Sequence, residues 1–182
     1  DSMALALGAA WAAPRTRSEV GCVVVDHGLQ AGSAEVAARA AGALASRGIA
    51  VEVRRVEVGR DGGIEAAARQ ARLAALSCDG HPVLLGHTLD DQAETVLLGL
   101  LRGSGIRSLA GMSVRRGPFL RPLLGIRRAE TEAACREWGV EWWDDPMNTD
   151  PRFARVRARS ALALLASELG RDVAVGLART AD

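Results

Sequence analysis

Hydrophobic and polar positions along the first half of the chain predict strands that alternate with helices. Residues 20–26 are almost wholly apolar, which is typical of a strand buried on both faces. Residues 51–58 alternate Val with Glu or Arg, as a strand nearer the sheet edge does, and a third apolar strand is expected at 82–86. Ala-rich helices are expected at about 33–47 and 64–76. This order predicts an α/β fold, a doubly wound parallel sheet with helices on both faces.

The helix after the third strand begins with an unusual set of polar side chains. The apolar positions on its expected buried face are Leu89, Ala93, Val96, Leu97 and Leu100. His87, Asp91 and Glu94 are spaced i, i+4 and i+7, so the pattern predicts that all three project from one helix face. An imidazole beside two carboxylates can bind a divalent metal, bind an ammonium group or transfer a proton. Thr88 followed by Asp91 is also the pattern of a capping box, so a purely structural role stays open.

The second half of the chain is less regular. A short extended piece is expected around 119–123, a helix at 128–138 and a structured loop at 141–151. Another helix is expected at about 153–169, followed by a helical tail. Because ligands of parallel α/β sheets bind at the carboxyl ends of strands, Asp26, His27 and His87 lie where a site is expected.

The net charge of +1 hides a strong segregation of charge. Residues 95–128 contain seven Arg and no acid, residues 129–150 contain seven acids and one Arg, and residues 151–167 contain four Arg and no acid. Such segregated basic blocks are typical of a surface that binds a polyanion, and here they favour contact with RNA or with phosphate. All 23 basic residues are Arg.

Cysteine spacing and hydropathy limit the class of protein. Cys22, Cys78 and Cys135 are far apart and odd in number, which disfavours a disulfide framework or a CxxC metal site and fits a reducing compartment. No stretch has the length and hydropathy of a membrane span. We therefore expect a cytoplasmic protein with no membrane partner.

The first residues predict a nucleotide loop cut short. Asp1-Ser2 leads directly into a helical pattern, whereas a doubly wound sheet normally starts with a strand and a glycine loop whose N–H groups bind phosphate. We expect a fragment that lacks this first strand and is unstable as an isolated chain.

Several motifs, in this order, resemble the N-type ATP pyrophosphatases, and in particular the tRNA(Ile)-lysidine synthetase family. Together they cover most of the chain: Asp1-Ser2, residues 25–29, 63–72, 86–95, 102–105, 121–124 and 145–150. The resemblance implies a Rossmann-like, adenine nucleotide alpha hydrolase-like domain at 1–150, with 151–182 as a helical extension. It also implies ATP and Mg²⁺ as cofactors, and free L-lysine and a CAU-anticodon tRNA(Ile) as partners.

The implied reaction has two steps. ATP adenylates the C2 oxygen of the wobble cytidine and pyrophosphate leaves; the ε-amine of lysine then displaces AMP to give lysidine. Three alternatives remain open: another tRNA-modifying enzyme of this superfamily such as a thiolase, a non-catalytic RNA-binding module, and a fragment that is itself inactive.

The resemblance also implies roles for individual residues. ATP would be bound by Asp1, Ser2, Asp26, His27, Gly86 and His87. The lysine ammonium would be bound by Asp91 and Glu94, and Asp91 would also be a Mg²⁺ ligand. The catalytic set would be His87, Asp91 and Glu94 with Arg69 and Arg72, which lie three apart on one helix. The tRNA phosphates would be bound by Arg102, Arg107, Arg115, Arg116, Arg121, Arg155 and Arg157. Val156 stands where the family's R-N-R motif has Asn, whereas both arginines of the motif, Arg155 and Arg157, are present.

Overall fold

The computed structural model describes residues 1–28, 30–57, 59, 64–76, 80–103 and 109–181. By its contacts the chain divides into two compact units, one made of Asp1, Leu84–Ala134 and Asp144–Asp182, the other of Ser2–Val83 and Cys135–Trp143. Of the predicted site residues, Arg107 lies outside the described residues.

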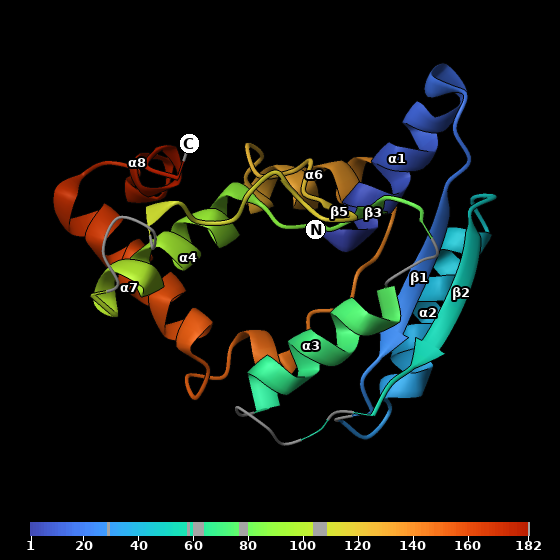
Figure 1. The fold of residues 1–182 in the computed structure, drawn as a ribbon, viewed down its shortest axis with the longest axis horizontal. Helices are drawn as coiled ribbons and strands as arrows, with labels where there is room; N and C mark the ends of the chain where they lie inside the picture. Colours follow the sequence, from blue (N-terminus) through green and yellow to red (C-terminus); the bar gives the residue numbers. More distant parts are fainter. Residues whose placement is uncertain (29, 58, 60–63, 77–79, 104–108, 182) are drawn as a thin grey trace. The chain divides into compact units, whose positions relative to one another are not determined.

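One unit contains a two-stranded parallel sheet. Its elements are α1 (Ser2–Thr16), β1 (Gly21–Asp26), α2 (Ser33–Ala45), β2 (Ala50–Arg55) and α3 (Ile64–Leu76). β1 and β2 pair in parallel with Gly21 opposite Ala50 and Asp26 opposite Arg55, and α2 makes the crossover between them (Figure 1). Buried Ala6, Leu44 and Ile49 join α1, α2 and the start of β2 in one apolar cluster. This is the α/β arrangement that the sequence predicts, with shorter strands.

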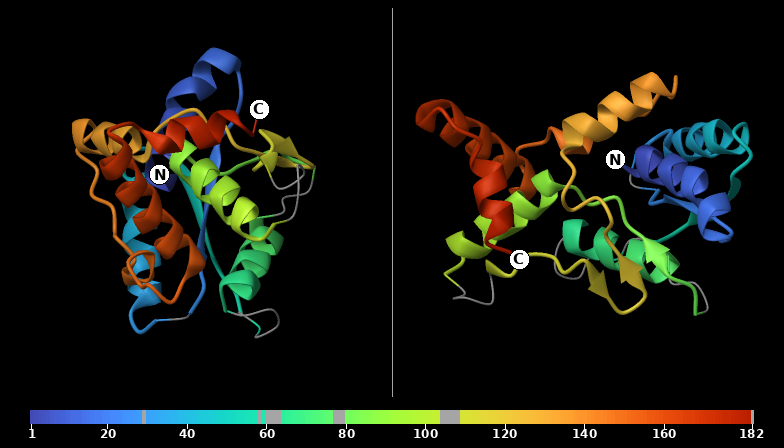
Figure 2. Two further views of the ribbon diagram at one scale, coloured as in Figure 1. Left: turned by 90° about the vertical axis from the view of Figure 1, so that its left-hand side faces the viewer. Right: turned by 90° about the horizontal axis from the view of Figure 1, so that it is seen from above.

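The other unit is built mainly from helices. Its elements are the second residue of β3 (Val83–Leu84), α4 (Leu89–Leu101), β4 (Arg115–Arg116), β5 (Phe119–Leu120), most of α6 (Arg128–Glu137), η1 (Pro146–Asn148), α7 (Ala154–Leu169) and α8 (Val173–Arg179). α4, α7 and α8 pack against one another through Ala93, Leu162 and Ala174 (Figure 2). α7 ends at Gly170, whose positive φ of 60° is a conformation that glycine adopts without strain. This three-helix core supports the candidate site.

Three sequence-based expectations about burial and pairing need correction. The described strands form two sheets, β1-β2 and β3-β5-β4, because the two-residue β3 pairs with β5 of a hairpin that was predicted only as an extended piece. Val23, Val24 and Val25 are half-buried rather than buried on both faces. Leu100 is 46 % exposed, because the buried face of α4 runs through Ala93, Val96 and Gly99 instead.

Candidate functional site

The start of α4 is fixed by the capping box that the sequence predicts. Thr88 is the N-cap residue, in an extended conformation, and its side chain is fully buried. The Asp91 amide donates to Thr88 Oγ1 at 3.4 Å, and Asp91 Oδ2 accepts from the Thr88 amide at 2.8 Å and from the Thr88 hydroxyl at 2.9 Å. One oxygen of Asp91 is therefore held by local structure, so capping and a role in a site are compatible here.

The other oxygen of Asp91 contacts an arginine distant in sequence. Arg128 Nη2 donates to Asp91 Oδ1 at 2.9 Å, and Arg128 Nε donates to Asp1 Oδ2 at 3.1 Å. Thr131 Oγ1 also donates to Asp1 Oδ1, at 2.6 Å. One guanidinium thus bridges Asp1, in the predicted nucleotide loop, and Asp91, in the predicted lysine site.

These contacts keep Asp91 ionised. Burial by itself raises the pKa of Asp91, but the charge of Arg128, the hydrogen bonds from Thr88 and the nearby His87 outweigh burial, and the pKa lies below its ordinary value. Asp91 is therefore a carboxylate at neutral pH, with its side chain 13 % exposed.

Glu94, one turn further along α4, is buried more deeply. Its side chain is 1 % exposed, and its partners come from α7: Arg159 Nε donates to Glu94 Oε1 at 2.8 Å, and Arg155 Nη1 lies 3.9 Å from Oε2. Glu94 Oε2 is buried and accepts no hydrogen bond from the described residues. Desolvation raises the pKa of Glu94, and Arg159 opposes that rise only in part. A buried carboxylate oxygen without a donor is a ready acceptor for a cationic ligand.

His87 does not lie on the helix face that the spacing predicted. It precedes the N-cap Thr88, outside α4, so helical periodicity does not apply to it. Gly86 and His87 lie in the connection between β3 and α4, and Asp90 faces another partner, with its Oδ1 at 2.9 Å from Arg127 Nη2. Of these predicted residues, Asp91 and Glu94 lie on one face of α4.

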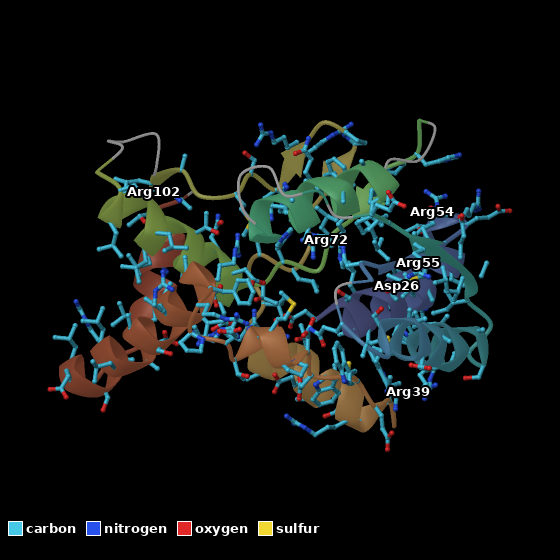
Figure 3. The ribbon with its side chains drawn as sticks, turned by 90° about the horizontal axis from the view of Figure 1, so that it is seen from below. Asp26, Arg39, Arg54, Arg55, Arg72 and Arg102 are labelled. Atoms are coloured by element: carbon cyan, nitrogen blue, oxygen red, sulfur yellow. The ribbon has the colours of Figure 1, made fainter. Side chains whose placement is uncertain are left out.

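The unit that contains β1 holds the other predicted nucleotide residues. Asp26 ends β1, is 5 % exposed, and its Oδ1 accepts from the Gly28 amide at 2.9 Å. The pKa of Asp26 is lowered by that backbone hydrogen bond, by a hydrogen bond from the Ser33 side chain, and by the charges of Arg55 and His27. Figure 3 shows Asp26 and Arg55 at the neighbouring ends of β1 and β2. Asp26 would make the same hydrogen bond to the turn that follows β1 if its role were only structural.

The other candidate arginines lie on several elements. Arg69 and Arg72 lie on α3, and Arg72 is labelled in Figure 3. Arg102 follows α4 and is exposed, and Arg115 and Arg116 form the exposed strand β4. Arg121 is 5 % exposed; its Nη1 donates to the Ser113 carbonyl at 2.8 Å, and its Nε has no acceptor among the described residues. Burial lowers the pKa of Arg121, and the charge of Arg116 adds to this.

Arg155 and Arg157, predicted to contact tRNA, have partners within the protein. Arg155 lies beside the buried Glu94, and Arg157 Nη1 donates to the carbonyls of Pro151 and Arg152 at 2.7 and 2.9 Å. Their contacts order the site and the loop before α7.

This chain is similar to known proteins over its whole length. The model of the PP-loop domain matches residues 1–165. The chain belongs to the PP-loop family. Within that family it is 56 % identical to the tRNA(Ile)-lysidine synthase of Cutibacterium acnes, 56 % to that of Leifsonia xyli and 57 % to that of Mycolicibacterium paratuberculosis, over all of this chain. It spans between 56 % and 60 % of the length of these relatives.

A solved structure supports the fold of this PP-loop chain. The U34-tRNA thiolase NcsA from Methanococcus maripaludis, with its [4Fe-4S] cluster, superposes with a TM-score of 0.73 at 16 % identity, over 99 % of this chain and 68 % of that one. The likeness confirms the α/β fold class. Among the described residues, no group of three or more His, Cys, Asp or Glu is arranged to hold a metal ion. No helix in the described part of the chain has the length and hydropathy to cross a membrane.

The site contains residues that sequence reasoning missed. Arg128, Thr131 and Arg159 contact the predicted acids but were not predicted as site residues. The only sequence signal for Arg128 was its position within the acid-free block, and Arg159 lies two residues beyond the R-N-R-like motif.

Proposed function

We propose that this chain is the catalytic PP-loop domain of a tRNA(Ile)-lysidine synthase. Identity of about 56 % over the whole chain to curated relatives of that name supports the proposal, as does the pair of carboxylates on α4. The substrates are ATP, free L-lysine and a tRNA(Ile) with a CAU anticodon, and the product carries lysine at C2 of the wobble cytidine. Such a tRNA-modifying enzyme acts in the cytoplasm.

The observation that carries the proposal is the state of Asp91 and Glu94. Both belong to the same face of α4, Asp91 is held ionised by Arg128, and Glu94 presents a buried oxygen that lacks a donor. An ammonium group has three N–H donors and needs acceptors that water does not occupy. The lysine ammonium therefore binds between Asp91 Oδ1 and Glu94 Oε2.

From the family resemblance we assign ATP binding to Asp1, Gly86 and His87 of one unit and to Ser2, Asp26 and His27 of the other. The resemblance likewise assigns to Arg69 and Arg72 of α3 the stabilisation of the negative charge that develops as pyrophosphate leaves. Asp91 Oδ2 already accepts two hydrogen bonds, so a Mg²⁺ ion on Asp91 would compete with the lysine ammonium for Oδ1, the oxygen that pairs with Arg128. We assign Mg²⁺ to the triphosphate, with which it enters.

The tRNA backbone is bound by the β4–β5 hairpin and its surroundings. Arg102, Arg115 and Arg116 are exposed and have no ion-pair partner in the described part of the chain, whereas Arg155 and Arg157 have partners within the protein. Arginines that are free to meet phosphates supply affinity that depends strongly on salt. The hairpin, rather than the start of α7, is therefore the RNA-binding surface.

The decisive assay is ATP-dependent transfer of radiolabelled lysine into unmodified CAU-anticodon tRNA(Ile). We expect transfer by a version of the chain with the predicted first strand and glycine loop restored, and its loss when that version carries the double substitution Asp91→Asn, Glu94→Gln. The matched control is Asp150→Asn with Glu168→Gln, which removes two carboxylate charges at residues that contact none of Asp91, Glu94 and Arg128. Survival of transfer in the double variant would refute the lysine site, and a thiolated nucleotide without lysine would instead assign the protein to the thiolase class.

The RNA-binding surface has its own test. Arg115→Glu with Arg116→Glu should weaken tRNA binding and reduce the slope of log Kd against log salt by about one for each phosphate that the protein no longer neutralises. The control Arg17→Glu with Arg39→Glu makes the same change in net charge at two exposed arginines, the second on α2 (Figure 3). Equal weakening in both variants would show that only net charge matters.

A further inference from the structure

Three arginines balance three acids around the proposed lysine site. Asp1 and Asp91 pair with Arg128, and Glu94 pairs with Arg159 and lies near Arg155. Formal charges in this group sum to zero before any ligand binds. An incoming ammonium would therefore meet a site that is already neutral, and it would share Asp91 with a guanidinium.

The geometry shows where the sharing occurs. Each carboxylate oxygen has two lone pairs. Both lone pairs of Asp91 Oδ2 are used by the amide and the hydroxyl of Thr88, while Oδ1 accepts one hydrogen bond, from Arg128. The position that remains for a ligand on Asp91 is therefore on the same oxygen that Arg128 contacts.

The backbone of Arg128 is fixed independently of that contact. Its amide donates to Asp90 Oδ2 at 2.7 Å, and its neighbour Arg127 pairs with Asp90 and with Asp172, the N-cap of α8. The Arg128 side chain is 24 % exposed, and two carboxylates hold it in place. Its charge cannot easily move away when a second cation arrives.

The chemistry of lysine transfer makes such a neighbour useful. The ε-nitrogen must form its bond to C2 with a lone pair, while the bond from C2 to the AMP oxygen breaks and that oxygen leaves with the electron pair. Lysine enters as an ammonium and therefore has to lose one proton before attack and a second one after it, both to solvent. Unbalanced acids would hold the ammonium tightly and oppose the first loss.

We propose that Arg128 is a positioning residue that shares Asp91 Oδ1 with the substrate nitrogen and favours the neutral amine that attacks C2. This inference rests on the proposed function. The charged or titratable groups that face the proposed site are Asp1, His87, Asp91, Glu94, Arg128, Arg155 and Arg159. Asp90, Arg127 and Asp172 form a separate group of ion pairs, whose contact with this set is the hydrogen bond from the Arg128 amide to Asp90.

The test is steady-state lysidine formation by Arg128→Gln and Arg128→Lys with lysine as the varied substrate. Loss of an adjacent cation raises the pKa of a bound amine by about 1–3 units, so kcat of Arg128→Gln at neutral pH should fall about tenfold or more. KM for lysine should fall with kcat, because the ammonium form is held more tightly, and kcat/KM should change little. Raising the pH should restore kcat. Arg128→Lys keeps the charge and should retain both constants.

Arg152→Gln is the control. It removes an arginine that pairs with Asp150 and contacts none of Asp1, Asp91, Glu94 and Arg128, so KM and kcat should stay at wild-type values. A rise in KM for Arg128→Gln, or equal losses in Arg128→Gln and Arg128→Lys, would show that Arg128 is only structural and overturn the inference.

A measurement on the wild-type protein covers the case in which Arg128→Gln does not fold. If the site favours the neutral amine, kcat should level off well below the ordinary lysine pKa of about 10.4. A kcat that rises in proportion to hydroxide up to about pH 10 would refute the inference. Absence of any lysine transfer by the folded version with the first strand and glycine loop restored would instead refute the proposed function.

Discussion

The ion pair between Glu94 and Arg159 gives the sharpest test of how the site is held together. Arg159→Met keeps most of the apolar stem but removes the guanidinium that donates to Glu94 Oε1 at 2.8 Å. A carboxylate that is 1 % exposed is then left with Arg155 at 3.9 Å. Removing one partner of a buried pair costs about 3–5 kcal/mol, and because Arg159 itself is partly exposed we expect about 2–3 kcal/mol.

The destabilisation should depend on pH. The pKa of Glu94 is already raised in the folded protein by burial, and removal of Arg159 raises it further. A group whose pKa is higher in the folded state favours folding when it is protonated and disfavours folding as pH rises through that pKa. The destabilisation by Arg159→Met should therefore be large at about pH 8 and fade as pH falls towards about 5.

Thermal unfolding followed by circular dichroism between about pH 5 and pH 8 measures both effects. For a chain of this length about 2–3 kcal/mol corresponds to a Tm lower by about 4–12 °C at the alkaline end. Arg157→Met is the matched control on the same helix, since Arg157 contacts two backbone carbonyls and not Glu94. A decrease in Tm for Arg159→Met that is independent of pH, or no larger than that of Arg157→Met, would refute the buried-charge argument.

The remaining predictions concern local structure and acid stability. Thr88→Ala removes the capping box and should cost about 1–2 kcal/mol in urea unfolding; a change below about 0.5 kcal/mol would show that Asp91 does not need the cap. Gly111→Ala should destabilise more than Gly117→Ala: both glycines have positive φ (52° and 59°), but a Cβ at 111 would lie 2.8 Å from Gln92 Oε1 whereas one at 117 meets nothing within 4 Å. Equal destabilisation would assign the cost to φ alone. The pKa values of Asp26 and Asp91 are lowered, so their stabilisation is present above the unfolded value of about 3.9 and is lost as pH falls below it; urea midpoints that already fall between about pH 7 and 5 would contradict this.

Local sequence signals predicted local structure well. α3 has the predicted bounds, Ile64–Leu76, and the capping box at Thr88 was readable from two residues at fixed spacing. Both depend on contacts within one or two helical turns. The prediction for His87 was wrong because helical periodicity does not extend beyond the N-cap. Counting it back from α4 to His87 placed that residue on a helix face to which it does not belong.

The partners of the carboxylates could not be predicted in this way. Arg128 is 37 residues from Asp91, and Arg159 is 65 residues from Glu94. Periodicity gives the direction of a side chain on its own helix but does not say which distant helix packs against it. The basic blocks at 95–128 and 151–167 were therefore interpreted as surfaces for RNA or phosphate, although several of their arginines neutralise acids inside the protein.

Every cation in these ion pairs is a guanidinium, because the chain contains no lysine. Reagents that acylate, methylate or crosslink primary amines will therefore leave the pairs at Asp90, Asp91 and Glu94 chemically intact. An amine-reactive probe directed to the site would meet no competing ε-amine in residues 1–182. Covalent capture with such a probe could thus report on a bound substrate amine without background from the side chains that build its site.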